Sequence, residues 1–257
     1  MREYFYKVIK SRAFLSLTFT ITSFALTNQL NAYTRFQYQL DGKVKNYRVH
    51  WVFLDLFDNS SSTIKAFRKQ GKKVICYFSA GTYENWRSDK GRFPSSIRGK
   101  SVDGWAGEQW LDTSSSTTLS IMKSRLDLAR SKGCTGVDPD NVDGFDNNTG
   151  FNLSKSTSIN YLKRLASEAH SRGLWIGLKN SAEIASSLSS TMNFAVVEEC
   201  FKYNECGSYS SFVSKRKPVF LIEYSSGSRS MCNQADSRRM NLAFFNLDLN
   251  GKFKVCH

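Results

Sequence analysis

The sequence predicts a single α/β domain, a (β/α)8 barrel of the TIM type. Strand and helix patterns alternate about eight times over roughly 200 residues after residue 49, as expected for eight β/α units. Glycines end several predicted helices, and polar residues follow nearly every predicted strand. A doubly wound sheet is the alternative, but no Gly-x-Gly-x-x-Gly motif follows the first strand.

The first half of the chain contains four predicted strands and two predicted helices. Apolar runs predict strands at residues 49–57, 73–81 and 110–112, and an acidic strand within residues 133–145. Amphipathic stretches predict helices at residues 62–70 and 117–132. Gly71 and Gly133 follow these helices, as expected because glycine readily adopts the left-handed conformation that ends a helix.

The second half repeats the alternation. It contains predicted helices at residues 156–172, 181–190 and 209–215, and residues 235–241 lead into the last apolar run. It contains predicted strands at residues 174–179, 194–199, 218–224 and 242–247. No low-complexity linker is long enough to divide the barrel into two domains.

The amino-terminal residues have the layout of a secretory signal peptide. A basic start is followed by the apolar run Ala13–Leu26 and by polar residues that lead to Ala32. The run of about 14 residues is shorter than the roughly 20 that cross a membrane, so cleavage near Ala32 is favoured over an uncleaved anchor. We therefore expect residues 1–32 to be removed from a secreted, extracellular protein whose barrel domain spans residues 33–257.

The chain is basic, with 36 Lys and Arg against 22 Asp and Glu and a formal net charge of +14. The basic residues are scattered along the sequence, so they predict a solvated basic surface and no nucleic-acid partner. Attachment to an anionic cell wall is the alternative.

The cysteine content is typical of an oxidising compartment and allows up to three disulfides. The six cysteines are Cys76, Cys134, Cys200, Cys206, Cys232 and Cys256. Because no Cys-x-x-Cys pair is present and the chain has 3 histidines, we expect no metal cluster and no cofactor. The pairs considered are Cys206–Cys232, whose loops share one face of the barrel, and Cys76–Cys134, whose strands are not neighbours in the predicted order. These pairs leave Cys200 and Cys256 without a predicted partner.

One stretch, Gly133–Phe145, is unusually acidic. It places Asp138, Asp140 and Asp143 within six residues, directly after a short apolar run. In a strand Asp138 and Asp140 share a face, and their carboxylates resist simultaneous ionisation, so one pKa should be raised. An Asp-rich turn and an oxygen-ligand site for a hard cation are the alternatives.

Polar residues cluster at the predicted carboxyl ends of the strands, where barrel enzymes place their active sites. They are Asp55, Tyr77, Asp138, Asp140, Lys179, Asn180, Glu198, Glu199, Glu223 and Tyr224. Asp140 and Glu198 end the fourth and sixth predicted strands, so they can face one another across a barrel mouth, as a glycosidase requires. Glu199 competes with Glu198, because side chains alternate along a strand and only one of the two can face inward.

Several ordered segments are shared with one known family. They are Phe36–Leu40, Val74–Arg87, Gly104–Trp105, Trp110–Asp112, Gly133–Gly144, Ala169–Leu174, Gly177–Asn180, Glu198–Cys200, Glu205–Cys206, Lys217–Val219 and Glu223–Tyr224. From about Phe36 to its end, the chain resembles glycoside hydrolase family 114, the endo-α-1,4-polygalactosaminidases. The resemblance implies a (β/α)8 barrel that cleaves α-1,4-linked galactosamine polymers. Phe36 and Tyr38 depart from the family pattern, which commonly has tryptophan there, and Val197 and Glu199 also differ from it.

The resemblance and the strand positions together suggest roles for the site residues. By similarity to α-glycosidase barrels, Asp140 is the predicted nucleophile and Glu198 the predicted general acid/base, with retention of the α configuration. The predicted substrate-binding residues are Asp55, Tyr77, Asp138, Asp143, Lys179, Asn180, Glu223 and Tyr224. Lys179 is open to two interpretations: its charge lowers the pKa of nearby carboxylates, or it forms a structural ion pair.

The sequence therefore predicts a secreted, endo-acting glycosidase. We expect a monomer that acts on a galactosamine-containing polysaccharide, without stable membrane insertion. A hydrolase of another α-linked glycan and a non-catalytic carbohydrate-binding barrel are the alternatives. The carboxylate pair argues against pure binding, because a lectin does not need paired acids at opposing strand ends.

Overall fold

The computed structural model describes residues 34–256. The predicted signal peptide, residues 1–32, lies outside the described residues. Within them, no helix combines the length and the apolar character that crossing a membrane requires.

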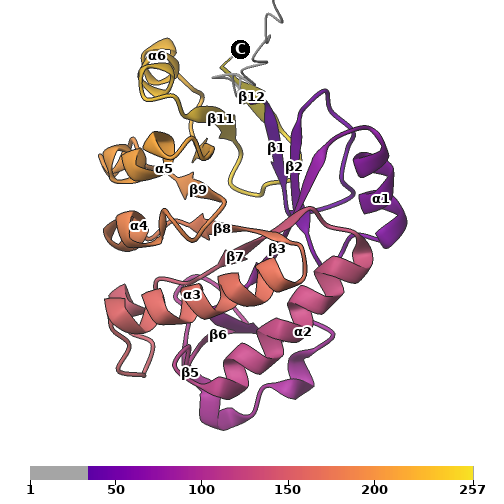
Figure 1. Cartoon of the computed structure of the whole chain (residues 1–257), viewed down its shortest axis with the longest axis vertical. Helices are drawn as coiled ribbons and strands as arrows, with labels where there is room; N and C mark the ends of the chain where they lie inside the picture. Colours follow the sequence, from indigo (N-terminus) through magenta and orange to yellow (C-terminus); the bar gives the residue numbers. More distant parts are fainter. Residues whose placement is uncertain (1–33, 257) are drawn as a thin grey trace, which may run out of the picture.

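The described chain forms the predicted barrel, with eight parallel strands side by side (Figure 1). In sheet order they are β1 (Phe36–Gln39), β2 (Trp51–Asp55), β3 (Lys73–Ser79), β7 (Gly136–Asp140), β8 (Trp175–Lys179), β9 (Phe194–Glu198), β10 (Val219–Glu223) and β11 (Asn241–Phe245). A short strand, β12 (Phe253–Val255), pairs antiparallel with β11. Because β1 also lies against β11, the sheet curves until it nearly closes.

Helices surround the sheet, and the predicted helices are present. They are α1 (Ser61–Lys69), α2 (Ser116–Lys132), α3 (Lys155–Ser171), α4 (Ala182–Leu188), α5 (Ser210–Ser214) and α6 (Arg229–Ser237). In Figure 1 they follow one another around the strands from α1 to α6. The helix α6 begins at Arg229, because the Ser228 hydroxyl caps it by accepting the N–H of Met231 at 3.1 Å.

Two predictions about strand membership are wrong. Residues 110–112 were expected in the barrel, but β6 (Glu108–Leu111) belongs to a separate antiparallel sheet with β4 (Thr82–Glu84) and β5 (Arg98–Ser101). This small sheet also carries the 3-10 helices η1 (Lys90–Arg92) and η2 (Ser95–Ile97) between its strands. The barrel instead begins with β1, which was not predicted. The prediction counted residues 110–112 as a barrel strand and omitted β1, so the two errors cancel. Asp140 therefore still ends the fourth barrel strand and Glu198 the sixth.

Aromatic rings fill the interior of the barrel. They belong to Phe36, Tyr38, Phe53, Phe194, Phe220 and Phe245. The ring centres of Phe36 and Phe53 lie 5.0 and 5.2 Å from that of Phe220, so Phe220 is packed from two sides. Since side chains alternate, the next inward position after Phe194 and Val196 on β9 is Glu198, at the mouth.

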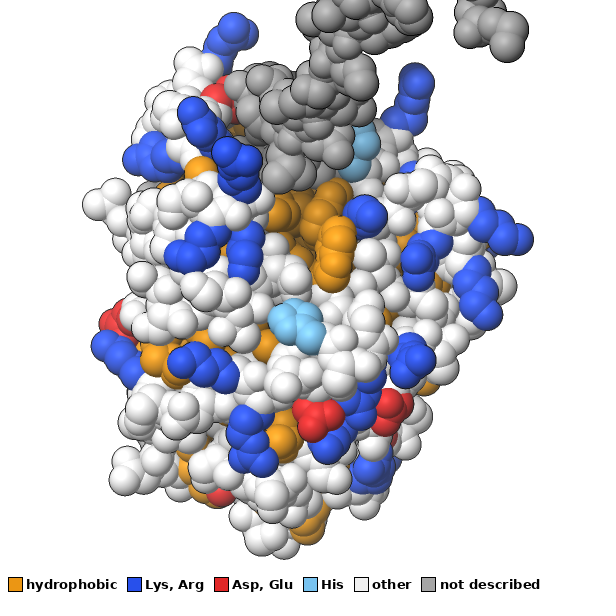
Figure 2. All heavy atoms as spheres, in the orientation of Figure 1, with side chains coloured by type: hydrophobic (Ala, Val, Ile, Leu, Met, Phe, Trp, Pro, Cys, Tyr) orange, Lys and Arg blue, Asp and Glu red, His pale blue; other side chains and the backbone are white. Residues whose placement is uncertain are grey.

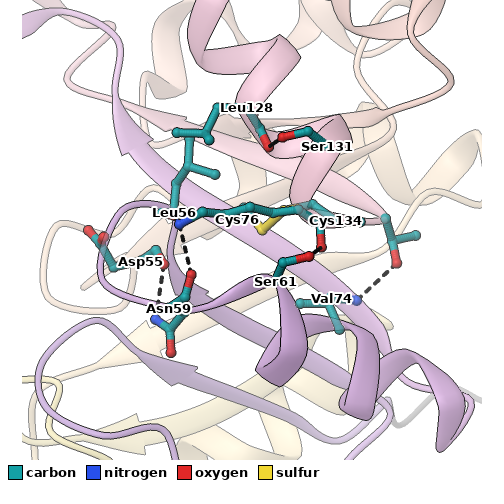
Figure 3. Close-up of a disulfide and its surroundings, with 12 residues drawn as sticks. Asp55, Leu56, Asn59, Ser61, Val74, Cys76, Leu128, Ser131 and Cys134 are labelled. Atoms are coloured by element: carbon teal, nitrogen blue, oxygen red, sulfur yellow. Dashed lines mark hydrogen bonds between the residues drawn. A yellow bond between two sulfur atoms is a disulfide. The ribbon is translucent and has the colours of Figure 1, made fainter. Parts of the chain in front are cut away.

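The disulfides correct one predicted pairing and confirm the other. Cys76 and Cys134 are bonded, because the small sheet leaves the barrel and makes β3 and β7 neighbours (Figure 3). The predicted Cys206–Cys232 pair is wrong. Instead Cys200 bonds Cys206, because the 3-10 helix η4 (Cys206–Tyr209) folds back to the end of β9, and Cys232 on α6 bonds Cys256 after β12.

The surface agrees with a solvated distribution of basic residues. On the face shown in Figure 2, Lys and Arg side chains are spread from one end to the other over several elements.

We expect Phe220→Ala to lower the free energy of unfolding by about 3–5 kcal/mol, because it opens a cavity among rings that cannot all collapse into it. Urea unfolding followed by far-ultraviolet circular dichroism measures the change. Tyr203→Ala is the control: its side chain is 62% exposed, so we expect a change within about 0.5 kcal/mol. Equal stability of the two variants would contradict the packed interior.

Candidate active site

Three charged side chains meet where neighbouring strands end. Asp140, Lys179 and Glu198 are the last residues of β7, β8 and β9. Nζ of Lys179 lies 3.0 Å from Oδ2 of Asp140 and 2.9 Å from Oε2 of Glu198. Because both oxygens lie within 3.0 Å of one nitrogen, they are at most about 6 Å from each other. The Lys179 side chain is only 2% exposed, so these ion pairs are shielded from solvent ions.

Three donors hold the Glu198 carboxylate. Besides Lys179, the Tyr224 hydroxyl donates to Oε1, and Nδ2 of Asn180 donates to Oε2 at 3.1 Å. Oδ1 of Asn180 also accepts the backbone N–H of Glu198 at 2.9 Å, so one side chain fixes both backbone and carboxylate. Burial raises the pKa of Glu198, but the charge of Lys179 and these hydrogen bonds outweigh burial and hold the pKa below its ordinary value.

The Asp140 segment is locked to the end of β3. Its backbone oxygen accepts the N–H groups of Ala80 and Gly81 at 2.8 and 3.2 Å. A Cβ atom at position 81 would lie 1.6 Å from the backbone oxygen of Asn141, so only glycine fits this close approach. Oδ1 of Asp140 accepts the N–H of Asn141 at 2.8 Å, and burial, with the charge of Asp140, raises the pKa of Tyr77 on β3. The ends of β3 and β7 therefore position this carboxylate together.

Asp138 lies one inward position before Asp140 on β7 and is fully buried. The Tyr38 hydroxyl donates to its Oδ2 at 2.9 Å, whereas its Oδ1 has no hydrogen-bond partner among residues 34–256. Burial raises the pKa of Asp138 to about 7; Asp140 and Glu198 add to the rise, while Lys179 and the Tyr38 hydrogen bond oppose it. The raised pKa expected for one member of the Asp138–Asp140 pair is thus found at the buried member.

Lys179 keeps its charge although it is buried. Its ammonium lies 5.7 Å from the ring centre of Tyr38 and 5.8 Å from that of Tyr77. Burial lowers the pKa of Lys179, but Asp140 and Glu198 outweigh burial and raise the pKa well above its ordinary value. Both interpretations of Lys179 hold together, since it forms ion pairs and also lowers the pKa of Glu198. In the described part of the chain, no group of three or more His, Cys, Asp or Glu side chains is placed to hold a metal ion.

Two predicted site carboxylates bind protein groups of neighbouring loops. Asp55, at the end of β2, accepts two hydrogen bonds from Arg87 at 2.7 and 3.1 Å, and the N–H of Phe57 at 2.7 Å. Glu223 is buried on the outward face of β10, and its Oε1 accepts the N–H of Phe201 at 3.0 Å. Asp55 thus fixes the loop after β2, and Glu223 fixes the loop after β9.

Asp143 and Glu199 lie in the loops that follow the site strands. Asp143 precedes the 3-10 helix η3 (Gly144–Asp146), and burial, with the charge of Asp140, raises its pKa. Glu199 has a left-handed backbone with φ of 54°, and its carboxylate pairs with Lys202 at 2.9 Å. Of the two adjacent glutamates, Glu198 is therefore the one that contacts Lys179.

Sequence reasoning missed two residues near this cluster. Tyr38 was noted only as a departure from a family pattern, although it lies on the inner face of β1 and donates to Asp138. Glu108 on β6 was not considered; it is 8% exposed, and burial raises its pKa to about 7. The available signal was the alternation in Glu108–Leu111, which places Glu108 on the same face as the buried Trp110.

An open groove lies beside the carboxylates. It consists of two hollows of about 610 Å³ and 520 Å³. Both hollows are lined by Glu199, Lys202, Tyr224 and Ser225. Asp140, Lys179 and Glu198 do not line these hollows, but Tyr224, whose hydroxyl donates to Glu198, lines both of them.

The chain is similar to proteins of one hydrolase family. The sequence model of glycoside-hydrolase family GH114 matches residues 21–257. A crystal structure of Aspergillus fumigatus Ega3 in complex with galactosamine is 42% identical, with a TM-score of 0.82 over 88% of this chain and 96% of that chain. The glycoside hydrolase domain of PelA from Pseudomonas aeruginosa is 14% identical, with a TM-score of 0.67 over 87% of this chain and 98% of that chain, and shares the fold. No curated protein gives a significant match.

Asp138 makes the stability of the fold depend on pH. Its pKa is raised to about 7, so the folded protein holds this proton more tightly than the unfolded chain, whose Asp pKa is about 4. The stability that Asp138 contributes is therefore fully present below about pH 4 and is lost as the pH rises through about 7.

We expect Asp138→Asn, which carries no titrating group, to gain stability relative to the wild type as the pH rises from about 4 to 8. Urea unfolding of both proteins across this range measures the difference. A constant difference at every pH would contradict the raised pKa of Asp138.

Proposed function

The chain belongs to glycoside-hydrolase family GH114, and we propose that it cleaves internal α-1,4 bonds of a galactosamine-containing polysaccharide outside the cell. One observation carries the proposal: Asp140 and Glu198 come from different strands and lie on either side of one buried ammonium. A glycosidase needs two such carboxyl groups flanking the scissile bond.

The separation of the carboxylates favours a retaining mechanism. Carboxyl groups of retaining enzymes are about 5–5.5 Å apart, whereas inverting enzymes leave roughly 6.5–9.5 Å for a water molecule. The two oxygens that contact Lys179 are at most about 6 Å apart, which supports the shorter class.

In the proposed reaction Asp140 attacks the anomeric carbon while Glu198 protonates the departing glycosidic oxygen. The bond from carbon to that oxygen breaks, and a covalent ester with Asp140 forms. Glu198, now ionised, then takes a proton from water, whose oxygen attacks the same carbon and releases Asp140. Burial raises the pKa of Glu198, whereas Lys179 and the hydrogen bonds lower it. A sugar that covers the carboxyl removes water from it, which raises the pKa toward the protonated form that the first step needs.

The proposed substrate rests on similarity and on charge. The relative at 42% identity, Ega3, was crystallised in complex with galactosamine. A cationic glycan is compatible with Lys179, because the surrounding carboxylates of Asp138, Asp140 and Glu198 offset its single charge. The open groove beside Tyr224 leaves room for further sugars of a polymer on that side, which suits endo-acting cleavage.

The proposed location follows from the disulfides. Three disulfides, with no free cysteine in residues 34–256, suit an oxidising compartment. Together with the layout of residues 1–32, they support secretion of residues 33–257, which we propose act as a monomer.

The catalytic assignment predicts the effect of two isosteric variants. We expect Asp140→Asn and Glu198→Gln each to lower kcat at least about a thousandfold, or ~4 kcal/mol of barrier, because each removes one member of the carboxyl pair. Reducing ends released from purified galactosaminogalactan measure the rate, and thermal unfolding confirms the fold. The control is Glu199→Gln. Glu199 is adjacent to Glu198 but pairs with Lys202, so this variant should keep kcat within about tenfold of the wild type. Wild-type turnover by either of the first two variants would exclude the assignment.

The mechanism predicts the configuration of the product. A double displacement at the anomeric carbon retains the α configuration, so the α-anomer should appear first. Proton NMR of the first product reads the anomer before mutarotation mixes the two forms. If the β-anomer appeared first, Asp140 would activate water instead of attacking the sugar.

A further inference from the structure

Two tryptophans are exposed on the small sheet that is inserted after β3. Trp86 and Trp105 are 50% and 64% exposed, and they are two of the four large apolar side chains that are exposed among residues 34–256. The other two, Tyr203 and Leu247, follow β9 and β11, so only the tryptophans share one part of the fold. Large apolar side chains are usually buried, and exposed ones that lie together mark binding surfaces.

The two tryptophans belong to segments that are hydrogen bonded to each other. The N–H of Asn85 donates to the backbone oxygen of Gly107 at 3.1 Å. Asn85 directly precedes Trp86, and Gly107 is two residues beyond Trp105. The backbone oxygen of Trp105 also accepts the N–H of Glu108, the first residue of β6, at 3.2 Å. Both indoles are therefore carried by neighbouring backbone segments that the small sheet holds in place.

Trp86 lies at the mouth of the barrel. The next residue, Arg87, donates to the carboxylate of Asp55, the last residue of β2, at 2.7 and 3.1 Å. In the other direction, Thr82 is four residues away, which is at most about 14 Å of extended chain. The Thr82 hydroxyl accepts Nδ2 of Asn141, which directly follows the proposed nucleophile, at 3.3 Å. Trp86 is therefore within reach of a sugar chain that is bound at the carboxylates.

The tryptophans and the open groove lie on opposite sides of the mouth. The insertion follows β3, the third strand of the barrel, whereas Tyr224 in the groove follows β10, the seventh. Strands four places apart in an eight-stranded barrel face each other across its axis. Asp140 ends β7, the neighbour of β3, and Glu198 ends β9, the neighbour of β10. A sugar chain that leaves the groove and passes both carboxylates therefore continues toward the tryptophans.

We propose that Trp86 and Trp105 form a binding platform for sugar residues of the polysaccharide on the Asp140 side of the site. One face of a hexopyranose ring carries apolar C–H groups, and stacking this face on a flat indole removes apolar surface of both from water. An enzyme that cuts inside a chain binds sugars on both sides of the scissile bond, and the groove lies on one side alone. This inference rests on the proposed function and adds a second binding region to it.

The test compares binding of a polymer with binding of a monosaccharide by isothermal titration calorimetry. Purified galactosaminogalactan is titrated into proteins that also carry Asp140→Asn, so that the polymer stays intact. We expect Trp86→Ala and Trp105→Ala each to weaken polymer binding at least about fivefold, because each removes the apolar surface of one indole. Galactosamine, titrated into the otherwise wild-type proteins, should bind with unchanged affinity, since one sugar between the carboxylates does not reach the platform. Trp86→Phe and Trp105→Phe are the matched controls: they keep a flat ring and should weaken polymer binding less than about threefold.

Two outcomes overturn the platform itself. One is a polymer affinity that both alanine variants leave unchanged, and the other is an equal loss of affinity for galactosamine, which indicates a general change of structure. Thermal unfolding checks the fold of each variant, and if Trp86→Ala does not fold, Trp105→Ala decides, because its side chain is the more exposed. A protein that binds no galactosaminogalactan overturns the platform and the proposed substrate together. Hydrolysis by the wild type is measured separately: a polymer that is bound but not cleaved overturns the proposed function, while the affinities still decide the role of the tryptophans.

Discussion

The site depends on one buried ammonium. Two carboxylates about 6 Å apart repel each other by about 3 kcal/mol at an effective dielectric constant of 20, so Asp140 and Glu198 cannot both stay ionised at low cost without a cation between them. Lys179 supplies this cation, and the same carboxylates keep it charged in spite of burial. The charges of Asp140, Lys179 and Glu198 depend on one another, because removing Lys179 leaves two carboxylates without a counter-charge and removing a carboxylate leaves Lys179 with fewer. Asp138 is fully buried beside this group, and burial, with the charges of Asp140 and Glu198, raises its pKa although Lys179 opposes the rise.

The barrel interior brings these charges together. Rings such as Phe53 and Phe220 pack across the axis and hold opposite strands at a set distance, so the next inward side chains converge at the mouth. Strand β3 is tied to β7 by the Cys76–Cys134 disulfide at one end and by the close approach at Gly81 at the other. This double attachment orients Asp140, because its backbone belongs to β7 while its neighbours belong to the end of β3.

The small sheet inserted after β3 adds chemistry that the barrel alone lacks. Loops after the strands carry function in barrel enzymes, since they can vary without disturbing the closed sheet. Here the insertion contributes Arg87, which binds Asp55, and the buried Glu108, which accepts a hydrogen bond from Thr82. The same insertion explains the error in strand membership, because a short antiparallel strand such as β6 has the same local alternation as a parallel barrel strand.

The sequence by itself determined the alternation of strands and helices and the family resemblance, because these depend on local periodicity, helix-ending glycines and contiguous motifs. It also predicted that Asp140 and one of the two adjacent glutamates, Glu198 or Glu199, end strands of the barrel. The tertiary structure alone decided which strands form the barrel, which cysteines pair, and that Lys179 bridges the two acids. It also decided that Glu198, and not Glu199, meets Lys179, since the chain turns into the left-handed conformation directly after β9. Contacts of this kind join residues far apart in the sequence. Their geometry follows from how the strands pack around the aromatic interior, which no local pattern specifies.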